Sequence, residues 1–243
     1  MKFSHLPRIY TSEHIYEKQI LIMEKDNFHY LKSVIRVRRS ETFRLFNALD
    51  GEFLVAVKEI NRASLEIEVS ALIREIEEEK PLELAMCIIK QDRMLEAIKS
   101  AVQLGVTRII PLVSDRTQYK QIPREKIQKC IVGSVQQCER FKLPVLEQEL
   151  NLLDFCNKFG NKQIIFACES ETEDNKILNI NKIEDSPVIL IGPEGGFNEQ
   201  EIEMIKSMKK AEPVSLGRSV LRAEVAATSA LACVSMVRSK VLW

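Results

Sequence analysis

From residue 82 onward, short apolar segments alternate with longer amphipathic ones, and this alternation limits the fold more than any other feature of the sequence. Strands that are joined by helices form a largely parallel sheet with helices on both faces, so the pattern predicts an α/β domain. The expected strands are residues 82–89, 107–113, 163–167, 187–191 and 213–216, and the expected helices are residues 92–104, 124–140, 198–208 and 221–237. Asp92 is the expected cap of the first helix, and Gly105 its expected end.

The first seventy residues favour β structure instead. Short strand candidates lie at residues 42–46, 53–57 and 64–69, and Asp50-Gly51 between the first two is a hairpin signal. The charged segment at residues 75–81 is typical of a linker. We therefore expect a small β-barrel domain over residues 1–74 and the α/β domain over residues 75–243.

The composition narrows the class of protein. Hydrophobic residues make up 45% of the 243 residues and charged residues 29%, a globular balance that fits two domains of ordinary size. The N-terminus has no apolar run and the most apolar stretch, residues 225–237, is too short for a bilayer, so we expect a cytoplasmic protein with no membrane segment. The six cysteines and three histidines lack metal-ligand spacing, which predicts free thiols and no metal site.

The zero net charge hides a segregation of charge along the chain. Residues 86–145 hold eleven Lys and Arg against five Asp and Glu, whereas residues 146–212 hold seven Lys against fourteen acids. A basic stretch of this kind can bind a polyanion, although a solvated helix face is the simpler explanation from charge alone.

A glycine-rich turn follows the apolar segment at residues 187–191. It reads Gly192-Pro-Glu-Gly-Gly196 and precedes Asn198 and Glu201, which have capping-box spacing at a helix start. Glycines at the carboxyl end of a strand let a ligand approach the backbone, where open α/β sheets bind cofactors. The turn is neither a Walker loop nor G-x-G-x-x-G. The pattern alone leaves a ligand loop and a plain tight turn equally open.

A second stretch, residues 213–228, again joins a short strand to a helix through a glycine, Gly217. Arg222 and Glu224 stand at the entry of a helix that is apolar nearly all round. Such a helix is buried or packs against another subunit. By themselves, the two charged residues are explained by a surface ion pair or by the preferences of a first helical turn.

Together the two stretches resemble the RsmE family, the bacterial 16S ribosomal RNA uridine-N3 methyltransferases of the SPOUT superfamily. The family's L-I-G-P-E-G-G turn matches residues 190–196, and its S-L-G…L-R-x-E matches residues 215–224. Further matches at Lys90-x-Asp92-Arg93-Met94, Gln137-x-x-Arg140 and His29-Tyr30-Leu31 extend the resemblance over essentially the whole chain. The sequence departs from the family pattern at Gln91, Cys138, Glu139, Ser219, Ala223 and Val225.

The resemblance implies a C-terminal SPOUT-type parallel sheet whose chain forms a trefoil knot, and an N-terminal PUA-like β-barrel that binds RNA. It also implies a homodimer that acts on 16S ribosomal RNA within the assembled small subunit, with S-adenosylmethionine as cofactor. The implied cofactor-binding residues are Leu190, Gly192, Pro193, Glu194, Gly195, Gly196, Ser215, Leu216, Gly217, Leu221 and Arg222.

Two residues are the implied catalytic groups. Arg222 would stabilise charge that develops on the uracil oxygens, and Glu224 would accept the N3 proton or hold Arg222 in place. The implied RNA-binding residues are Arg8, Lys32, Arg36, Arg38, Arg93, Gln137 and Arg140.

Other functions remain open at this point. The same scaffold could methylate a different base or a ribose 2′-hydroxyl, or bind RNA without catalysis. A dinucleotide-dependent oxidoreductase is disfavoured because the chain lacks G-x-G-x-x-G after its strands.

Overall fold

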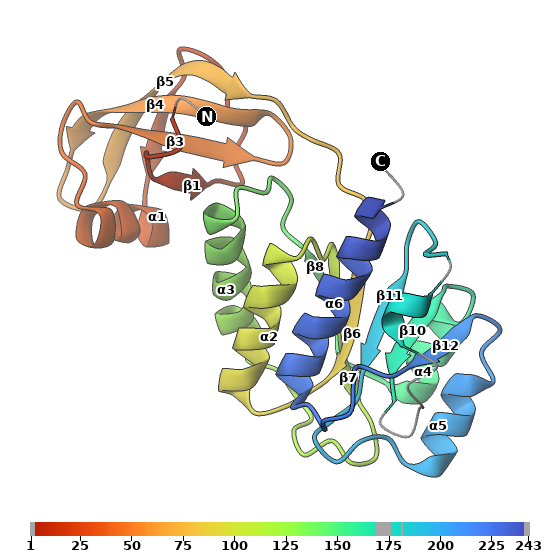
Figure 1. Cartoon of the computed structure of the whole chain (residues 1–243). Coiled ribbons are helices and arrows are strands. Elements are labelled where there is room, and N and C mark those ends of the chain that lie inside the picture. The colour runs from red at the N-terminus through yellow and green to blue at the C-terminus, as the bar shows by residue number, and fades with distance from the viewer. Residues whose placement is uncertain (1–2, 169–175, 181, 241–243) are drawn as a thin grey trace. The chain divides into compact units, whose positions relative to one another are not determined.

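The computed structural model describes residues 3–168, 176–180 and 182–240, traced in Figure 1. The chain divides into two compact units. Unit 1 comprises Met1–Glu78 together with Val135–Leu143, and unit 2 comprises Glu79–Ser134 and Pro144–Trp243. The N-terminal unit therefore incorporates a segment from the middle of the chain.

Unit 1 is built on a five-stranded sheet. Its order is β1-β3-β4-β5-β2, with β1 parallel to β3 and the other neighbours antiparallel, so β1 and β2 are the two edges of a curled half-barrel. The short helix α1 (Lys25–His29) and the π-helical segment η1 (Tyr30–Ile35) follow β2. The strands are β1 (Arg8–Tyr10), β2 (Ile20–Met23), β3 (Thr42–Asn47), β4 (Gly51–Ile60) and β5 (Leu65–Arg74).

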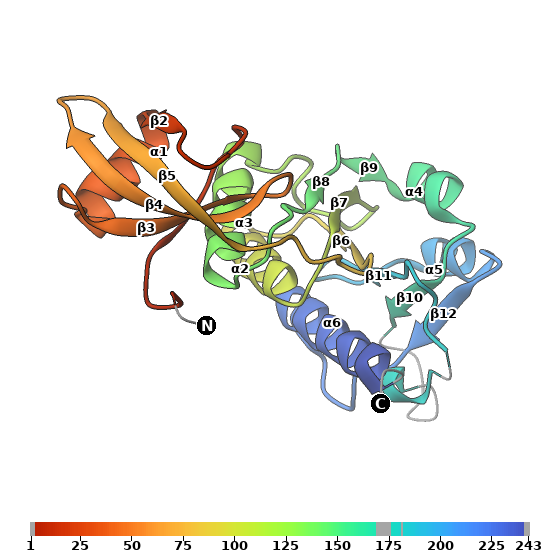
Figure 2. The same cartoon turned by 90° about the horizontal axis from the view of Figure 1, so that it is seen from above.

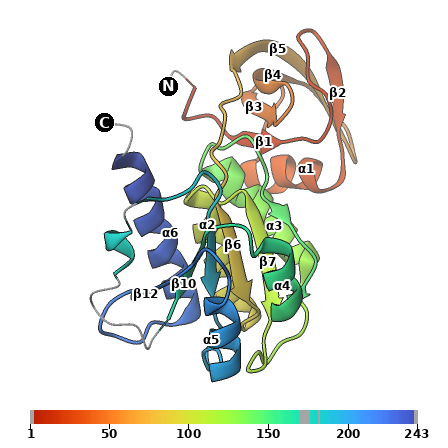
Figure 3. The same cartoon turned by 90° about the vertical axis from the view of Figure 1, so that its right-hand side faces the viewer.

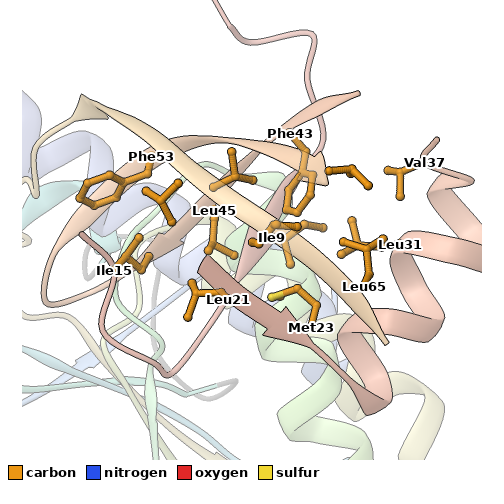
Figure 4. Close-up of a cluster of buried hydrophobic side chains, with 14 residues drawn as sticks. Ile9, Ile15, Leu21, Met23, Leu31, Val37, Phe43, Leu45, Phe53 and Leu65 are labelled. Carbon is orange, nitrogen blue, oxygen red and sulfur yellow. The ribbon is translucent and has the colours of Figure 1, made fainter. Parts of the chain in front are cut away.

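The core of unit 1 follows from the alternation of side chains along these strands. Val55 and Val57 of β4 and Leu65 and Ile67 of β5 point to the same face, where they are fully or almost fully buried. Leu31 of η1 covers this face (Figure 4). The predicted hairpin at residues 50–51 is confirmed, because β3 and β4 pair antiparallel across it.

Unit 2 contains a parallel sheet of seven strands. The order is β12-β10-β11-β6-β7-β8, with β9 also paired to β7, and every pair is parallel. The predicted α/β class is therefore confirmed. The strands are β6 (Glu83–Cys87), β7 (Arg108–Val113), β8 (Val145–Leu146), β9 (Leu150–Asn151), β10 (Ile164–Ala167), β11 (Val188–Ile191) and β12 (Ala211–Val214).

Helices cover both faces of this sheet. Figure 2 shows α2 and α6 on one side of the strands and α4 and α5 on the other, and Figure 3 shows α4 and α5 from the second side. Phe155 of α4 and Ile205 of α5 pack with alternate strand residues, among them Phe166 and Leu190. The helices are α2 (Gln91–Gln103), α3 (Arg124–Gln137), α4 (Leu152–Phe159), η3 (Ile177–Asn179), α5 (Glu199–Lys206) and α6 (Ala223–Lys240).

The helix ends agree with the sequence pattern in part. Asn198 and Glu201 form the predicted capping box of α5, and Gly105 has a φ of 90° just after α2. The prediction for Asp92 was wrong: Lys90 occupies the N-cap position of α2, and no side chain caps that helix. Among the described residues, no helix has both the length and the apolar character needed to cross a membrane.

Candidate active site

A pocket of about 530 Å³ lies in unit 2, at the carboxyl ends of the parallel strands. Its walls come from the turn after β11 at residues 192–197, from the segment between β12 and α6 at residues 215–222, and from Ala167 and Cys168 at the end of β10. Arg93 of α2 and Arg116 after β7 also line the pocket, as do Ile202 of α5 and Ala223 and Ala226 of α6. Two segments that are separate in sequence thus form one cavity, at the edge where open α/β sheets bind ligands.

The turn after β11 has the tight geometry that its glycines permit. The Gly196 N–H donates to the Pro193 carbonyl at 2.9 Å, and Gly196 has a φ of 65°, which an L side chain rarely adopts. A Cβ at Gly192 would lie 3.1 Å from the Phe197 ring, so only glycine fits there without movement. All the expected cofactor-binding residues of this turn line the pocket; Leu190 does not, because it is fully buried in β11.

The segment after β12 forms the opposite wall. Ser215 is buried, Leu216 and Leu221 are half-buried, and residues 217–220 are exposed. Gly217 has a φ of 126°, and its N–H donates to the Ser215 hydroxyl at 3.3 Å. The expected cofactor-binding residues of this segment, Arg222 included, all line the pocket.

The two expected catalytic residues differ in their surroundings. Arg222 is exposed and lines the pocket, whereas Glu224 is 8% exposed in the first turn of α6 and is not among the lining residues. The ion pair of Glu224 is with Arg93, whose Nε lies 3.8 Å from Glu224 Oε1. The other carboxylate oxygen of Glu224, Oε2, is buried and has no hydrogen-bond partner among the described residues.

Arg93 connects three parts of the site. Its Nη1 lies 3.6 Å from Glu194 Oε1 in the glycine turn, while its Nε faces Glu224. One guanidinium from α2 therefore pairs with a carboxylate from the turn after β11 and with another from α6. Arg93 was expected to contact RNA, and it lies at the pocket wall.

Arg8 is buried inside unit 1, although it was expected to contact RNA. It is 5% exposed, its Nε lies 3.1 Å from Glu52 Oε1, and its Nη1 donates to the Val135 and Arg140 carbonyls. Its guanidinium also stacks 3.4 Å from the centre of the Phe46 ring. Burial lowers the pKa of Arg8 to about 10. The expected phosphate contact by Arg8 does not fit this burial, because the side chain holds unit 1 together.

The other expected RNA-binding residues lie nearer the surface. Lys32, Arg36 and Arg38 are exposed on and just after η1, with Lys32 Nζ 4.9 Å from the centre of the Phe28 ring. Gln137 is exposed and Arg140 half-buried, both in the segment Val135–Leu143 of unit 1.

The sequence patterns missed the turn at residues 114–117. The Asp115 N–H donates to Glu201 Oε1 at 2.7 Å, and Arg116 Nη1 donates to the Gly195 carbonyl at 2.9 Å. The sequence did contain a signal for this part of the site: these polar residues directly follow β7, at the carboxyl edge of the sheet where the glycine turn also lies.

A thiol lies beneath the turn at residues 114–117. Cys87 Sγ donates to the Ser114 hydroxyl at 3.5 Å. Burial raises the pKa of the Cys87 thiol to about 11, so this cysteine is no nucleophile at neutral pH. All six cysteines are free thiols, as predicted.

Comparisons with known proteins agree on one family. Residues 77–235 match the family model described as an RNA methyltransferase domain. A ribosomal RNA small subunit methyltransferase E from Rickettsia conorii is 36% identical over 235 residues, which are 96% of each chain.

Two solved structures share the fold. One, a Legionella pneumophila protein described as a methyltransferase and solved with the bound cofactor SAM, is 27% identical and has a TM-score of 0.84 over 96% of this chain and 98% of that one. The other, a ribosomal RNA small subunit methyltransferase E from Neisseria gonorrhoeae bound to S-adenosyl methionine, has a TM-score of 0.85 with the same coverage. At 24% identity, that second likeness concerns the fold alone.

Proposed function

Because the chain belongs to the ribosomal RNA small subunit methyltransferase E family, we propose that it methylates N3 of a uridine in 16S ribosomal RNA. S-adenosylmethionine is the proposed methyl donor, and the small ribosomal subunit in the cytoplasm is the proposed substrate. The pocket carries this proposal, since the two stretches that resemble methyltransferase motifs form its two walls although they are separate in sequence.

The pocket suits S-adenosylmethionine in size and chemistry. A volume of about 530 Å³ falls within the range of small-molecule sites. Leu216 and Leu221 provide apolar surface for an adenine ring, and Gly192, Gly195 and Gly196 place no side chain between the backbone of the turn and a ligand. The bound cofactor supplies a methyl group on a positively charged sulfur.

Arg222 is the proposed contact to the uracil. It is exposed at the pocket wall, where its guanidinium can donate to a uracil oxygen that gains negative charge as N3 loses its proton. Donors held close to such an oxygen lower the barrier because the charge is largest in the transition state.

Glu224 is the proposed acceptor of the N3 proton. A buried carboxylate oxygen without a partner is costly, so Oε2 of Glu224 needs an explanation other than stability. The ion pair between Arg93 and Oε1 holds the carboxylate from its other side and leaves Oε2 free to take the proton. Arg93 is thus a proposed positioning residue for Glu224.

Unit 1 is the proposed RNA-binding part of the chain. Exposed Lys32, Arg36 and Arg38 are grouped on and just after η1, and such side chains bind phosphates without reading sequence.

We also propose a homodimer in which α6 contributes to the subunit interface. Val225 and Met236 of α6 are 44% and 61% exposed, although the helix is apolar and packs its inner side on α2 and β11. Val220, in the pocket wall, is 78% exposed. Covering these side chains with a second subunit would remove apolar surface from water beside the pocket and along α6. Light scattering at micromolar concentration should give about twice the mass of the chain, and a monomer mass would contradict the proposal.

The cofactor proposal is testable at Gly217. Its φ of 126° strains any L side chain, so Gly217→Val should displace the pocket wall. Because residues 217–220 are exposed, the fold should persist. We expect the wild type to bind S-adenosylmethionine in a calorimetric titration, and Gly217→Val to bind it at least about tenfold more weakly.

Gly133→Ala is the matched control for Gly217→Val, since Gly133 lies within α3 and a Cβ there meets no atom within 4 Å. This control should bind S-adenosylmethionine like the wild type. A wild-type chain that fails to bind S-adenosylmethionine would refute the proposed cofactor.

A further inference from the structure

The turn at residues 114–117 is fixed to the start of α5 and to the glycine turn. Ser114 and Thr117 close it, with the Ser114 N–H donating to the Thr117 hydroxyl at 2.9 Å. At its tip, the Asp115 N–H donates to Glu201 Oε1, while Asn198 Nδ2 donates to Asp115 Oδ2 at 3.3 Å. The tip is therefore held against the start of α5, directly after the glycine turn.

Arg116 extends from this tip over Gly195. A Cβ at Gly195 would lie 3.6 Å from both Cβ and Cδ of Arg116, so the aliphatic part of the arginine lies beside the position that a side chain at Gly195 would take. Its Nη1 donates to the Gly195 carbonyl at 2.9 Å. The side chain also lines the pocket. Arg116 thus constrains the glycine turn through a charge-assisted hydrogen bond to its backbone.

We propose that Arg116 is a positioning residue that holds the glycine turn in the conformation that binds S-adenosylmethionine. The inference rests on the proposed cofactor. Gly195 and Gly196 have no side chains to fix their backbone, and the flexibility of glycine raises the entropy that binding must remove. A fixed Gly195 carbonyl reduces that loss, because the turn is ordered before the ligand arrives.

The expected change in affinity for S-adenosylmethionine is opposite in direction to the change that the charge of Arg116 alone would cause. S-adenosylmethionine carries a net positive charge, since its sulfonium and ammonium groups outnumber its carboxylate. If Arg116 acted only through its charge, removing it would tighten binding of this cation. A positioning role predicts weaker binding.

The test compares Arg116→Met with the wild type by calorimetric titration of S-adenosylmethionine. Methionine keeps an aliphatic side chain beside Gly195 and removes the hydrogen bond to its carbonyl. We expect the Kd to rise roughly tenfold, with the thermal unfolding temperature within about 2 °C of the wild type, because Arg116 is exposed. Lys120→Ala is the matched control, because it removes a nearby exposed cation that does not line the pocket.

A second ligand separates positioning from a direct contact with the cofactor's carboxylate. 5′-Methylthioadenosine lacks the carboxylate and the amino group but retains the adenosine part. Equal weakening for both ligands supports the positioning role. If only S-adenosylmethionine binds more weakly, Arg116 contacts the carboxylate and the inference fails. It fails equally if the Kd of Arg116→Met lies within twofold of the wild type. A wild type that binds neither ligand would instead refute the proposed function.

Discussion

Arg222→Ala should lower the rate of methyl transfer by about 10²- to 10³-fold at saturating S-adenosylmethionine, the usual cost of removing one donor to a developing oxyanion. The side chain is exposed, so its loss should leave the unfolding temperature unchanged. Single-turnover methylation of small ribosomal subunits measures the effect directly, because product release does not limit it.

Arg222→Lys is the matched control for charge. A lysine keeps the positive charge but loses the planar, two-pronged donor, so we expect an intermediate rate.

Glu224→Gln should also slow the reaction, since an amide does not accept the proton. The rate of the double variant with Arg222→Ala should fall by much less than the product of the two single-variant factors. A wild-type rate in Glu224→Gln would remove that residue from the mechanism, and orientation of the uracil by Arg222 would be the role that remains.

Glu52→Ala should destabilise unit 1 by about 3–5 kcal/mol, the cost of leaving buried charge without its partner. Glu52 is 1% exposed and pairs with three guanidinium groups. The nearest side-chain nitrogens of Arg8 and Arg44 lie 3.1 Å from its Oε1, and Arg74 Nη1 lies 3.6 Å from its Oε2. Glu139 also pairs with Arg44 and Arg74 but is only half-buried, so it cannot replace Glu52. Urea unfolding of the full chain provides the measurement.

Glu77→Ala is the control for this cluster. Glu77 pairs with Arg74 at 3.1 Å, but its side chain is 71% exposed, so its loss should cost only about 0–1 kcal/mol. Equal effects of Glu52→Ala and Glu77→Ala would show that burial of the cluster contributes nothing to stability.

Local patterns predicted much of the fold. The alternation of apolar segments gave the main strands and helices of unit 2 because each strand or helix is defined by residues close in sequence. The capping box at Asn198 was visible for the same reason. The pattern missed α4, whose eight residues carry only a short apolar face, and the edge strands β1 and β2, which have three and four residues.

Long-range packing was beyond what the sequence could predict. The segment Val135–Leu143 joins unit 1 because Arg8 donates to two of its carbonyls and the Phe141 ring packs near Phe46, contacts that link residues more than ninety positions apart. The family resemblance implied an RNA contact for Arg8. The burial of Arg8 against Glu52 and these two carbonyls could not be predicted from residues that are close in sequence. Arg116 was likewise missed, since its role depends on a contact with Gly195.

Mass spectrometry of 16S ribosomal RNA nucleosides is the most direct test of N3 methylation by this chain. Cells that lack the protein should lose one N3-methyluridine, and the wild-type chain, but not Arg222→Ala, should restore it. Fragmentation assigns the methyl group to the base or to the ribose, which separates N3 methylation from 2′-hydroxyl methylation. We expect a methylated uracil fragment that depends on this chain. An unchanged N3-methyluridine content, or a lost methyl group that lies on a ribose or on another base, would contradict it.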